Sequence, residues 1–338
     1  MSNLIHLIFN EQIKIYIRKS TWVMYALILL LVLGIAFIEV AFETHEVKSF
    51  GDDWKTVLKA ENEKLLKEQE EFERKLEEGD YEYIFQPDMD QYEINSFYLA
   101  ENIKPVKFGA WQFVHGLKIV LSIISLFTII VAANIVSSEH RWGTIKLLLI
   151  RPISRSTIIL SKYLSVLLFA FITAIFLFIV SFLTGALFFG IESGLNPHSI
   201  VYDYSNSVKG QVVSENAPYL KYVSLPANIL ANYGYHMVIL IMMATLALMI
   251  STIFKNNALA IGVAIFLMFA GNSIVAFFSE HSWAKYILFA NLDLSQHINN
   301  SPLFEGMTLP FSLTILLLHY IIFIGIAWIV FVKRDVTE

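Results

Sequence analysis

The sequence contains no cysteine and little charge. With no thiol among its 338 residues, the chain can form no disulfide and no cysteine-ligated metal site. Charged residues make up 16% of the chain, against roughly 25% in a typical soluble protein. Apolar residues make up 56% and the mean hydropathy is +0.60. The charge is missing from long continuous stretches, which is typical of helices that cross a membrane.

The chain also lacks the short motifs of several protein classes. No G-x-x-x-x-G-K-[ST] sequence occurs, so we expect no nucleotide-binding P-loop. Neither H-E-x-x-H nor G-x-S-x-G is present, and no basic stripe with interleaved aromatic residues suggests a nucleic-acid partner. His236 and His319 lie inside apolar stretches, and we interpret both as hydrogen-bonded core histidines. We therefore predict no enzymatic activity, no bound metal or cofactor, and no nucleic-acid binding in this chain.

Six apolar segments are long enough to span a membrane as helices. They predict an all-α integral membrane protein with six transmembrane helices, at residues 22–42, 111–138, 160–191, 233–254, 258–279 and 311–332. Only three residues separate the fourth and fifth spans within 233–279, which indicates a tight helical hairpin. No small-residue cleavage site follows the first span, so we interpret it as a retained anchor and not as a signal peptide.

The distribution of basic residues predicts the orientation of the chain. The segments assigned to the inner side carry 11 Lys and Arg residues and four acidic residues, whereas segment 43–110 carries 9 basic and 18 acidic residues. Because Lys and Arg in short loops mark the cytoplasmic side, we predict that both termini are cytoplasmic and that 43–110 is extracytoplasmic. The predicted location is the lipid bilayer of a bacterial cytoplasmic membrane.

Two polar segments have a helical pattern of their own. Residues 1–20 combine apolar residues with Lys14 and Arg18, which predicts an amphipathic helix in the inner membrane interface. In the acidic segment 43–110, apolar residues recur at helical spacing along the run 52–79, which predicts an extracytoplasmic helical insertion. This insertion is either a docking surface or a solvated hairpin packed on itself or on a symmetry mate. The remaining polar segments are predicted as extracytoplasmic loops at 192–232 and 280–310 and a cytoplasmic tail at 333–338.

The cytoplasmic loop 139–159 contains the most distinctive pattern in the chain. Residues 137–162 read SSEHRWGTIKLLLIRPISRSTIILSK, so an apolar patch lies between cations and is interrupted by Gly143 and Pro152. A surface loop with this much apolar area is usually covered. We predict that it inserts into a groove of a cytoplasmic partner, where Glu139 pairs with a basic residue. In the alternative, Trp142 and the leucines simply lie in lipid.

This loop resembles the cytoplasmic coupling loop of type-2 ABC transporter permeases. These are the membrane subunits of bacterial exporters, including the bacitracin-resistance, lantibiotic-resistance and sodium-export groups. The resemblance implies that the loop couples the chain to a separate ATPase subunit, which binds ATP and Mg²⁺. The residues that it implies for this interface are Glu139, Arg141, Trp142, Gly143, Thr144, Ile145, Lys146, Leu148, Pro152 and Arg155.

The same resemblance implies a function and an assembly. The chain would be the permease subunit of an ATP-driven exporter of a peptide, antibiotic, lipid or ion. Two copies, or two related chains, would form the translocation pathway. The long acidic insertion is a departure from many members of that group and leaves the substrate open. The alternative function is a membrane sensor or scaffold with an extracytoplasmic binding domain and no transport activity; an intramembrane hydrolase is a weaker third possibility.

Several polar residues lie within the predicted spans. Such residues normally face other helices, where they either strengthen packing or line a pathway. The candidates for these two roles are Asn134, Ser137, Asn272 and His319.

Overall fold

The computed structural model is a mostly helical bundle. It describes residues 2–42, 51–78, 87–145, 153–191, 194, 197–203, 219–297 and 302–333. Within that part of the chain, six helices are long and apolar enough to span a membrane, which confirms the predicted number. They are α2 (Lys19–Ala41), α6 (Lys118–Arg141), α8 (Arg155–Phe189), α9 (Leu225–Ile253), α10 (Asn257–Phe277) and α12 (Leu309–Lys333).

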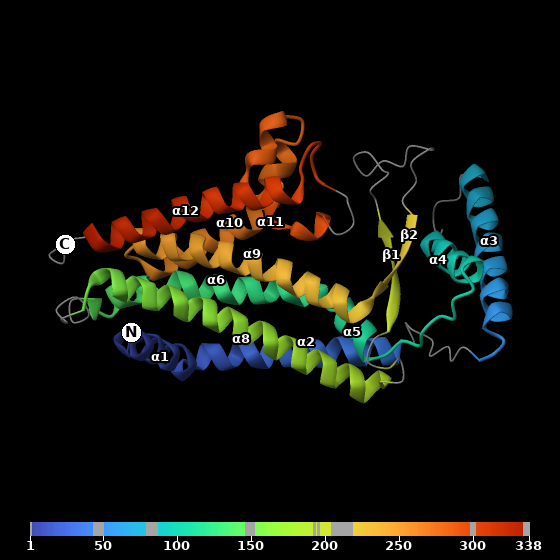
Figure 1. The fold of residues 1–338 in the computed structure, drawn as a ribbon, viewed down its shortest axis with the longest axis horizontal. Helices are drawn as coiled ribbons and strands as arrows, with labels where there is room; N and C mark the ends of the chain where they lie inside the picture. Colours follow the sequence, from blue (N-terminus) through green and yellow to red (C-terminus); the bar gives the residue numbers. More distant parts are fainter. Residues whose placement is uncertain are drawn as a thin grey trace.

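Helices α6 and α9 form the centre of the bundle (Figure 1). Most residues in the apolar stretch of each helix are buried, because α6 packs on α8, α9 and α10, and α9 also packs on α12. In contrast, α2, α10 and α12 bury only 28%, 22% and 22% of their most apolar stretch, and the rest is partly or fully exposed. An apolar outer surface around a packed centre is the arrangement that a hydrocarbon environment allows.

One end of the bundle, here called the α6–α8 end, is where α6 ends and α8 begins. Helix α1 (Ser2–Ile17) also begins at this end, and α12 finishes there (Figure 1). The Arg155 side chain donates a hydrogen bond to the carbonyl oxygen of Val332 at 2.9 Å, which joins the start of α8 to the end of α12. Arg18 has an extended backbone that separates α1 from α2.

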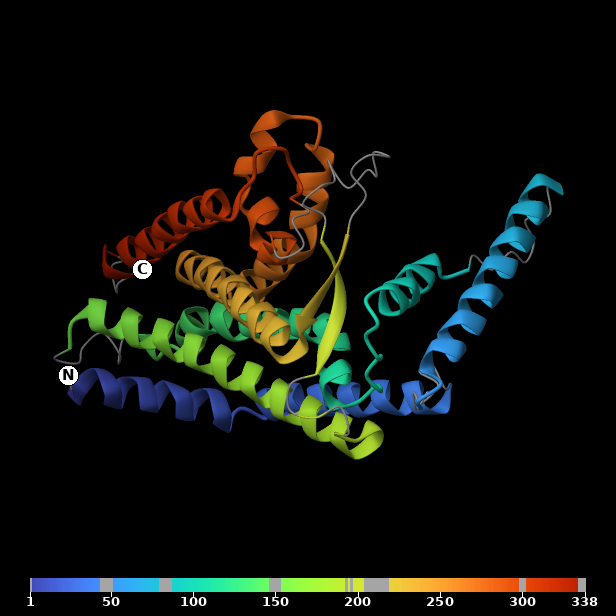
Figure 2. The same ribbon diagram turned by 45° about the vertical axis from the view of Figure 1, so that its right-hand side comes forward.

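The opposite end, here called the α3–α4 end, contains the shorter elements. Helices α3 and α4 stand apart from the bundle and pack on each other (Figure 2). A hydrogen bond of 3.0 Å from Asn62 Nδ2 to Ser96 Oγ links them. The elements at this end are α3 (Trp54–Glu78), α4 (Met89–Ala100), α5 (Ala110–Gly116), β1 (His198–Asp203) and β2 (Tyr219–Ser224). Between α10 and α12 the chain forms η1 (Ser282–Tyr286), α11 (Leu288–Leu292) and η2 (Leu294–His297).

The boundaries of three spans differ from the prediction. The second span, predicted at 111–138, is two helices, because the chain breaks at Leu117 directly after Gly116. Glycine disfavours the helix interior and is a common position for a break. Helices α8 and α9 begin earlier than predicted, since the side chains of Ser154 and Ser224 cap their first turns by accepting hydrogen bonds from backbone N–H groups.

The prediction of an all-α chain is wrong in one detail, because the segment 192–232 contains a two-stranded sheet. Strands β1 and β2 pair antiparallel, with His198 opposite Ser224. The rings of His198 and Tyr222 stack with their centres 4.7 Å apart. Aromatic and β-branched residues in both strands favour this pairing, a signal that the polar character of the whole segment obscured.

The contact between α5 and α8 provides a test of the packing. A Cβ atom added to Gly185 would lie 2.9 Å from Cα of Ala110. We expect Gly185→Ala to lower stability by about 1–3 kcal/mol, because the two backbones would have to separate. The measurement is the thermal unfolding midpoint of the purified chain in detergent. As a matched control, Gly262→Ala adds a Cβ with no atom within 4 Å and should leave the midpoint unchanged or slightly higher; equal shifts in both variants would contradict the packing.

Candidate functional site

A lysine ammonium is buried at the α6–α8 end of the bundle. Lys162 lies near the start of α8 with none of its surface exposed. Its Nζ atom donates to Glu11 Oε2 at 2.9 Å, Glu139 Oε1 at 3.0 Å and the carbonyl oxygen of Ile135 at 3.1 Å. A lysine has three protons to donate, and all three find acceptors here. The burial of an unpaired ammonium would cost several kcal/mol, so the two carboxylates are what allow Lys162 to occupy this position.

Lys14 completes the arrangement. Its Nζ atom lies 2.7 Å from Glu11 Oε1 and 3.0 Å from Glu139 Oε1. Burial disfavours the charged form of Lys14, but the two carboxylates outweigh this effect and raise the pKa of Lys14 above its ordinary value. The charge cluster, defined as Glu11, Lys14, Glu139 and Lys162, therefore contains two positive and two negative charges and is balanced.

The charge cluster joins three helices that are distant in the sequence. Glu11 and Lys14 come from α1, Glu139 from the last turn of α6, and Lys162 from α8. The contact between α1 and α8 continues beside it, because Gln12 Nε2 donates to the carbonyl oxygen of Ser165 at 2.6 Å. A shift of any one of these helices would therefore break charge-assisted hydrogen bonds to the other two.

Helix α1 packs a face of both polar and apolar residues on the bundle, with Ile15 in the core, and turns an apolar stripe away from it. Glu11 and Gln12 are buried. The exposed stripe repeats every four residues and consists of Ile5, Phe9, Ile13 and Ile17, which are 66%, 64%, 40% and 74% exposed. On a soluble protein an apolar stripe of this kind would face the core.

The chain folds back on itself directly after α6. Gly143 has a φ of +69°, a left-handed conformation that glycine adopts without strain. This turn brings the Thr144 hydroxyl to Glu139, where it donates a hydrogen bond to Oε2. Glu139 was expected to pair with a basic residue of a partner, but its carboxylate is buried and bonded to Lys14, Lys162 and Thr144 of its own chain.

Other residues of the predicted interface face outward. Arg141 is exposed and Trp142 is 57% exposed. The guanidinium carbon of Arg18 lies 5.1 Å from the centre of the Trp142 ring, within cation–π range. Ile145 is half-buried and packs on the core. Lys146, Leu148 and Pro152 lie outside the described residues.

The four polar candidates within the spans lie in different places. Ser137 is buried and donates to Asn257 Oδ1 at 2.8 Å, which links α6 to α10. His319 donates from Nδ1 to the carbonyl oxygen of Ile315 in its own helix at 2.9 Å. Asn134 is half-buried in α6. Asn272 lines a cleft at the other end of the bundle.

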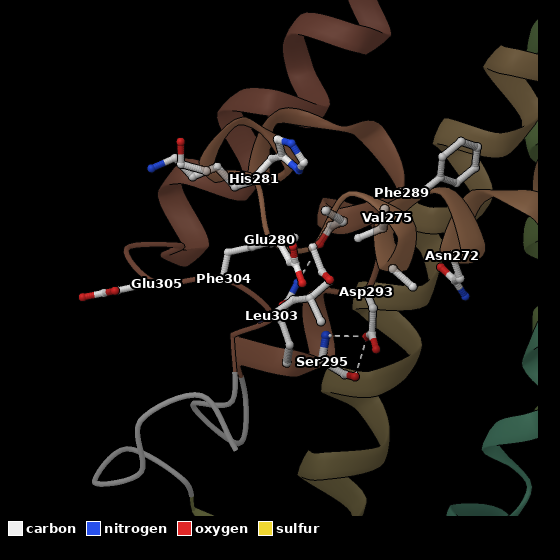
Figure 3. Close-up of a pocket in the computed structure, with 16 residues that line it drawn as sticks. Asn272, Val275, Glu280, His281, Phe289, Asp293, Ser295, Leu303, Phe304 and Glu305 are labelled. Carbon is white, nitrogen blue, oxygen red and sulfur yellow. Dashed lines mark hydrogen bonds between the residues drawn. The ribbon is translucent and has the colours of Figure 1, made fainter. Parts of the chain in front are cut away.

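This cleft was not predicted from the sequence. It consists of an outer cavity of about 1000 Å³ and an inner cavity of about 340 Å³, which share Asn272, Phe289, Asp293 and Ser295. The inner cavity lies between α6, α9 and α10. Figure 3 shows the outer cavity, where Asp293 accepts hydrogen bonds from Ser295 N and Ser295 Oγ at 3.0 and 2.5 Å. His236, expected to be a bonded core histidine, lies within 3.2 Å of Ser125 Oγ and lines the inner cavity.

Sequence reasoning also missed the charge cluster. Glu11 entered it only as an inner-side charge, Lys14 also as part of the amphipathic helix, and Lys162 also as the end of the loop pattern 137–162. The one available signal was Lys162, a cation within the apolar stretch predicted at 160–191. An ionisable residue inside a span normally has a partner, but the sequence does not reveal that α1 supplies one.

The six apolar helices make the chain a multi-pass membrane protein. Residues 83–337 match the family model described as "Protein of unknown function (DUF2705)", and the chain belongs to this family. It is 39% identical over 339 residues to "Uncharacterized protein YhcI" of Bacillus subtilis (strain 168), which covers 99% of this chain and 100% of the relative. It is 33% identical over 217 residues to "Uncharacterized membrane protein YdbK" of the same organism, over 63% of this chain and 78% of the relative.

These matches overturn the assignment to the type-2 ABC transporter permeases. The family model that matches is DUF2705, and neither relative is named as an ABC permease. Besides the general arrangement of the spans, the resemblance rested on residues 137–162, where cations flank small and apolar residues. Many basic loops between two spans share that composition, so it does not specify a family.

The charge cluster predicts a large effect of a small substitution. Glu139→Gln would leave Lys14 and Lys162 with Glu11 as the remaining carboxylate of the cluster. We expect a loss of about 3–5 kcal/mol in the free energy of unfolding, because one buried positive charge is left uncompensated. The measurement is denaturation of the purified chain by SDS in mixed micelles. Glu71→Gln, which removes the exposed 2.9 Å pair with Lys75, is the control and should leave the midpoint unchanged; similar behaviour of the two variants would refute the burial of the cluster.

Proposed function

We propose that the chain is the membrane-spanning subunit of a transport system that draws its energy from a separate cytoplasmic ATP-hydrolysing subunit. The segment between α6 and α8, residues 142–154, is the docking surface for that subunit. The chain itself performs no catalysis, and the partner binds ATP and Mg²⁺. The observation that carries this proposal is the charge cluster, because it fastens the start of the docking segment to α1 and α8.

The surface at the α6–α8 end supports docking of a protein. Arg141 and Trp142 are exposed side by side, and a cavity of about 580 Å³ opens between Arg141 and the residues Lys255 and Asn257. Exposed tryptophan and arginine side chains are the residues that most often dominate binding energy at protein interfaces. Arg141 and Lys255, the two cations that line this cavity, favour a partner with an acidic rim.

The proposed orientation places the α6–α8 end in the cytoplasm. The basic residues of the short loops support it. The exposed apolar stripe on α1 suits a helix that lies in the inner membrane interface of a bacterial cytoplasmic membrane. The α3–α4 insertion is then extracytoplasmic, and the cleft opens toward the outside. A second copy of the chain, or a related chain, completes the proposed pathway.

A membrane sensor or scaffold is the second candidate function. The observation that favours it is the position of α3 and α4, which stand apart from the bundle (Figure 2). In that case the same docking segment would recruit a cytoplasmic protein without moving a substrate. The two functions differ in whether partner binding is accompanied by ATP turnover that depends on this chain.

The test measures ATP hydrolysis by the purified complex in lipid nanodiscs. We expect an ATPase to co-purify with the chain and to be stimulated by it. Trp142→Ala should lower the stimulation at least about tenfold, since it removes a central interface contact. Phe266→Ala, which removes an aromatic side chain of similar exposure from α10, is the matched control and should behave like the wild-type chain.

Two results would count against the proposed function. If the complex hydrolyses no ATP above background while a cytoplasmic protein still binds through Trp142, the chain is a scaffold or sensor. If Trp142→Ala and Arg141→Ala both retain full stimulation and an unchanged unfolding midpoint, the docking segment has been placed wrongly.

A further inference from the structure

The inner cavity of the cleft is lined mainly by polar residues, although three of the helices around it are membrane-spanning. Nine of its fifteen lining residues are polar or charged, and they come from α6, α9, α10 and the segment 289–295. Polar and ionisable residues in spans are costly and commonly mark the path of a substrate or ion. The composition of the lining therefore favours a polar occupant of this cavity.

The size of the inner cavity limits that occupant to a small molecule. Its volume of about 340 Å³ is near the lower end of the range for small-molecule sites, about 300–1,000 Å³. It equals the liquid volume of roughly eleven water molecules. A solute with about that many non-hydrogen atoms fits, and an amino acid is a solute of this size.

Two opposite charges line the inner cavity without pairing with each other. Lys118 makes no hydrogen bond or ion pair with any residue that the structure describes. Asp293 is near enough for its charge to act on Lys118, but no ion pair joins them. Both hydrogen bonds from Ser295 go to Oδ1 of Asp293 (Figure 3), and Oδ2 accepts none from the described part of the chain. One cation and one carboxylate oxygen are therefore available to a ligand.

Three neutral side chains of the inner cavity are also available. Ser122, Tyr235 and Asn272 form no hydrogen bond with any described residue. Hydroxyl and amide groups can both donate and accept hydrogen bonds. The cavity therefore offers partners for a solute with several polar groups, in addition to the two charges.

The pair of charges selects a solute that carries both signs. A cation in the inner cavity would be repelled by Lys118, and an anion by Asp293. In a zwitterion each charge can meet an opposite charge, which offsets the cost of removing it from water. The outer cavity excludes neither sign, because Glu280 and Glu305 line it together with Lys285.

We propose that the inner cavity binds a small zwitterion of amino-acid size, with its ammonium at Asp293 and its carboxylate at Lys118. This proposal names the substrate class of the proposed function and rests on it only for the statement that the solute is transported. Binding of the solute to the chain requires no ATPase.

The first test measures the shift of the thermal unfolding midpoint of the purified chain in lipid nanodiscs, since a ligand of the folded state raises it. The probes are the standard L-amino acids, dialanine and trialanine, each added separately. We expect at least one amino acid to raise the midpoint more than either peptide does. The peptides carry the same two terminal charges, so they separate the size of the ligand from its charge.

The second test measures the contribution of each charge by isothermal titration calorimetry. The amino acid with the largest shift is compared with the acid that lacks its amino group and with the amine that lacks its carboxyl group. We expect the amino acid to bind at least about tenfold more tightly than either analogue, because each analogue loses a charge-assisted hydrogen bond.

Two substitutions assign the charges to their partners. Lys118→Gln should weaken binding of the amino acid and the acid but not of the amine. Asp293→Asn, which keeps an Oδ1 acceptor for Ser295, should weaken binding of the amino acid and the amine but not of the acid. Glu305→Gln, in the outer cavity only, and Lys104→Gln, outside the cleft, are the charge controls and should leave all three affinities unchanged. Unfolding midpoints without ligand verify that the variants fold.

Several results would overturn the proposal. No shift with any amino acid, or a larger shift with either peptide, would refute a site of amino-acid size. Equal binding of the amino acid and its two analogues, or unchanged affinities in both cleft variants, would show that Lys118 and Asp293 do not select the ligand. Selective binding without any coupled ATPase would preserve this site and refute transport, whereas a coupled ATPase in a chain that binds no amino acid would do the reverse.

Discussion

The position of one ammonium group constrains one end of the structure. Lys162 lies in a membrane-spanning helix with no exposed surface, and it is stable there only while carboxylates surround it. One carboxylate comes from the last turn of α6 and the other from α1. Helix α1 must therefore pack with Glu11 against the bundle, and this leaves its apolar stripe facing outward. The same requirement buries Glu139 and fixes where the segment after α6 begins.

Helix α6 connects the two sites. Glu139 of the charge cluster lies in its last turn, and Lys118 of the cleft is its first residue. Its 24 residues correspond to a rod of about 36 Å, and most of its surface is packed against α8, α9 and α10. A displacement of the docking segment would therefore reach the cleft through a single buried helix. The break at Leu117 separates this rod from α5.

The sequence was informative wherever one physical quantity dominates. Hydropathy locates the six spans because hydrocarbon excludes charge over about 20 residues, and the run 52–79 reads as a helix because its apolar residues have helical spacing. The caps at Ser154 and Ser224 extend α8 and α9 into polar sequence, where hydropathy gives no signal. The β1–β2 pair depends on register between segments about twenty residues apart, which composition does not contain.

The sites were less predictable, because each one joins residues from distant parts of the chain. Lys162 and Glu11 are 151 positions apart, and only the fold brings them together. Asp293 lies in a segment that was assigned to a polar loop, so the cleft that it lines could not be inferred. The pattern at 137–162 was distinctive in composition but not specific to a family, and for that reason it led to the wrong family.

The interaction energy between Glu139 and Lys162, which attach the start of the docking segment to the bundle, can be measured directly by a double-mutant cycle. The free energies of unfolding of the wild-type chain, Glu139→Gln, Lys162→Met and the double variant form the cycle. If the two residues form one buried unit, the double variant should be more stable than the sum of the single losses predicts, by about 1–3 kcal/mol. Additive losses, within about 0.5 kcal/mol, would contradict the account, since they would mean that neither side chain depends on the other.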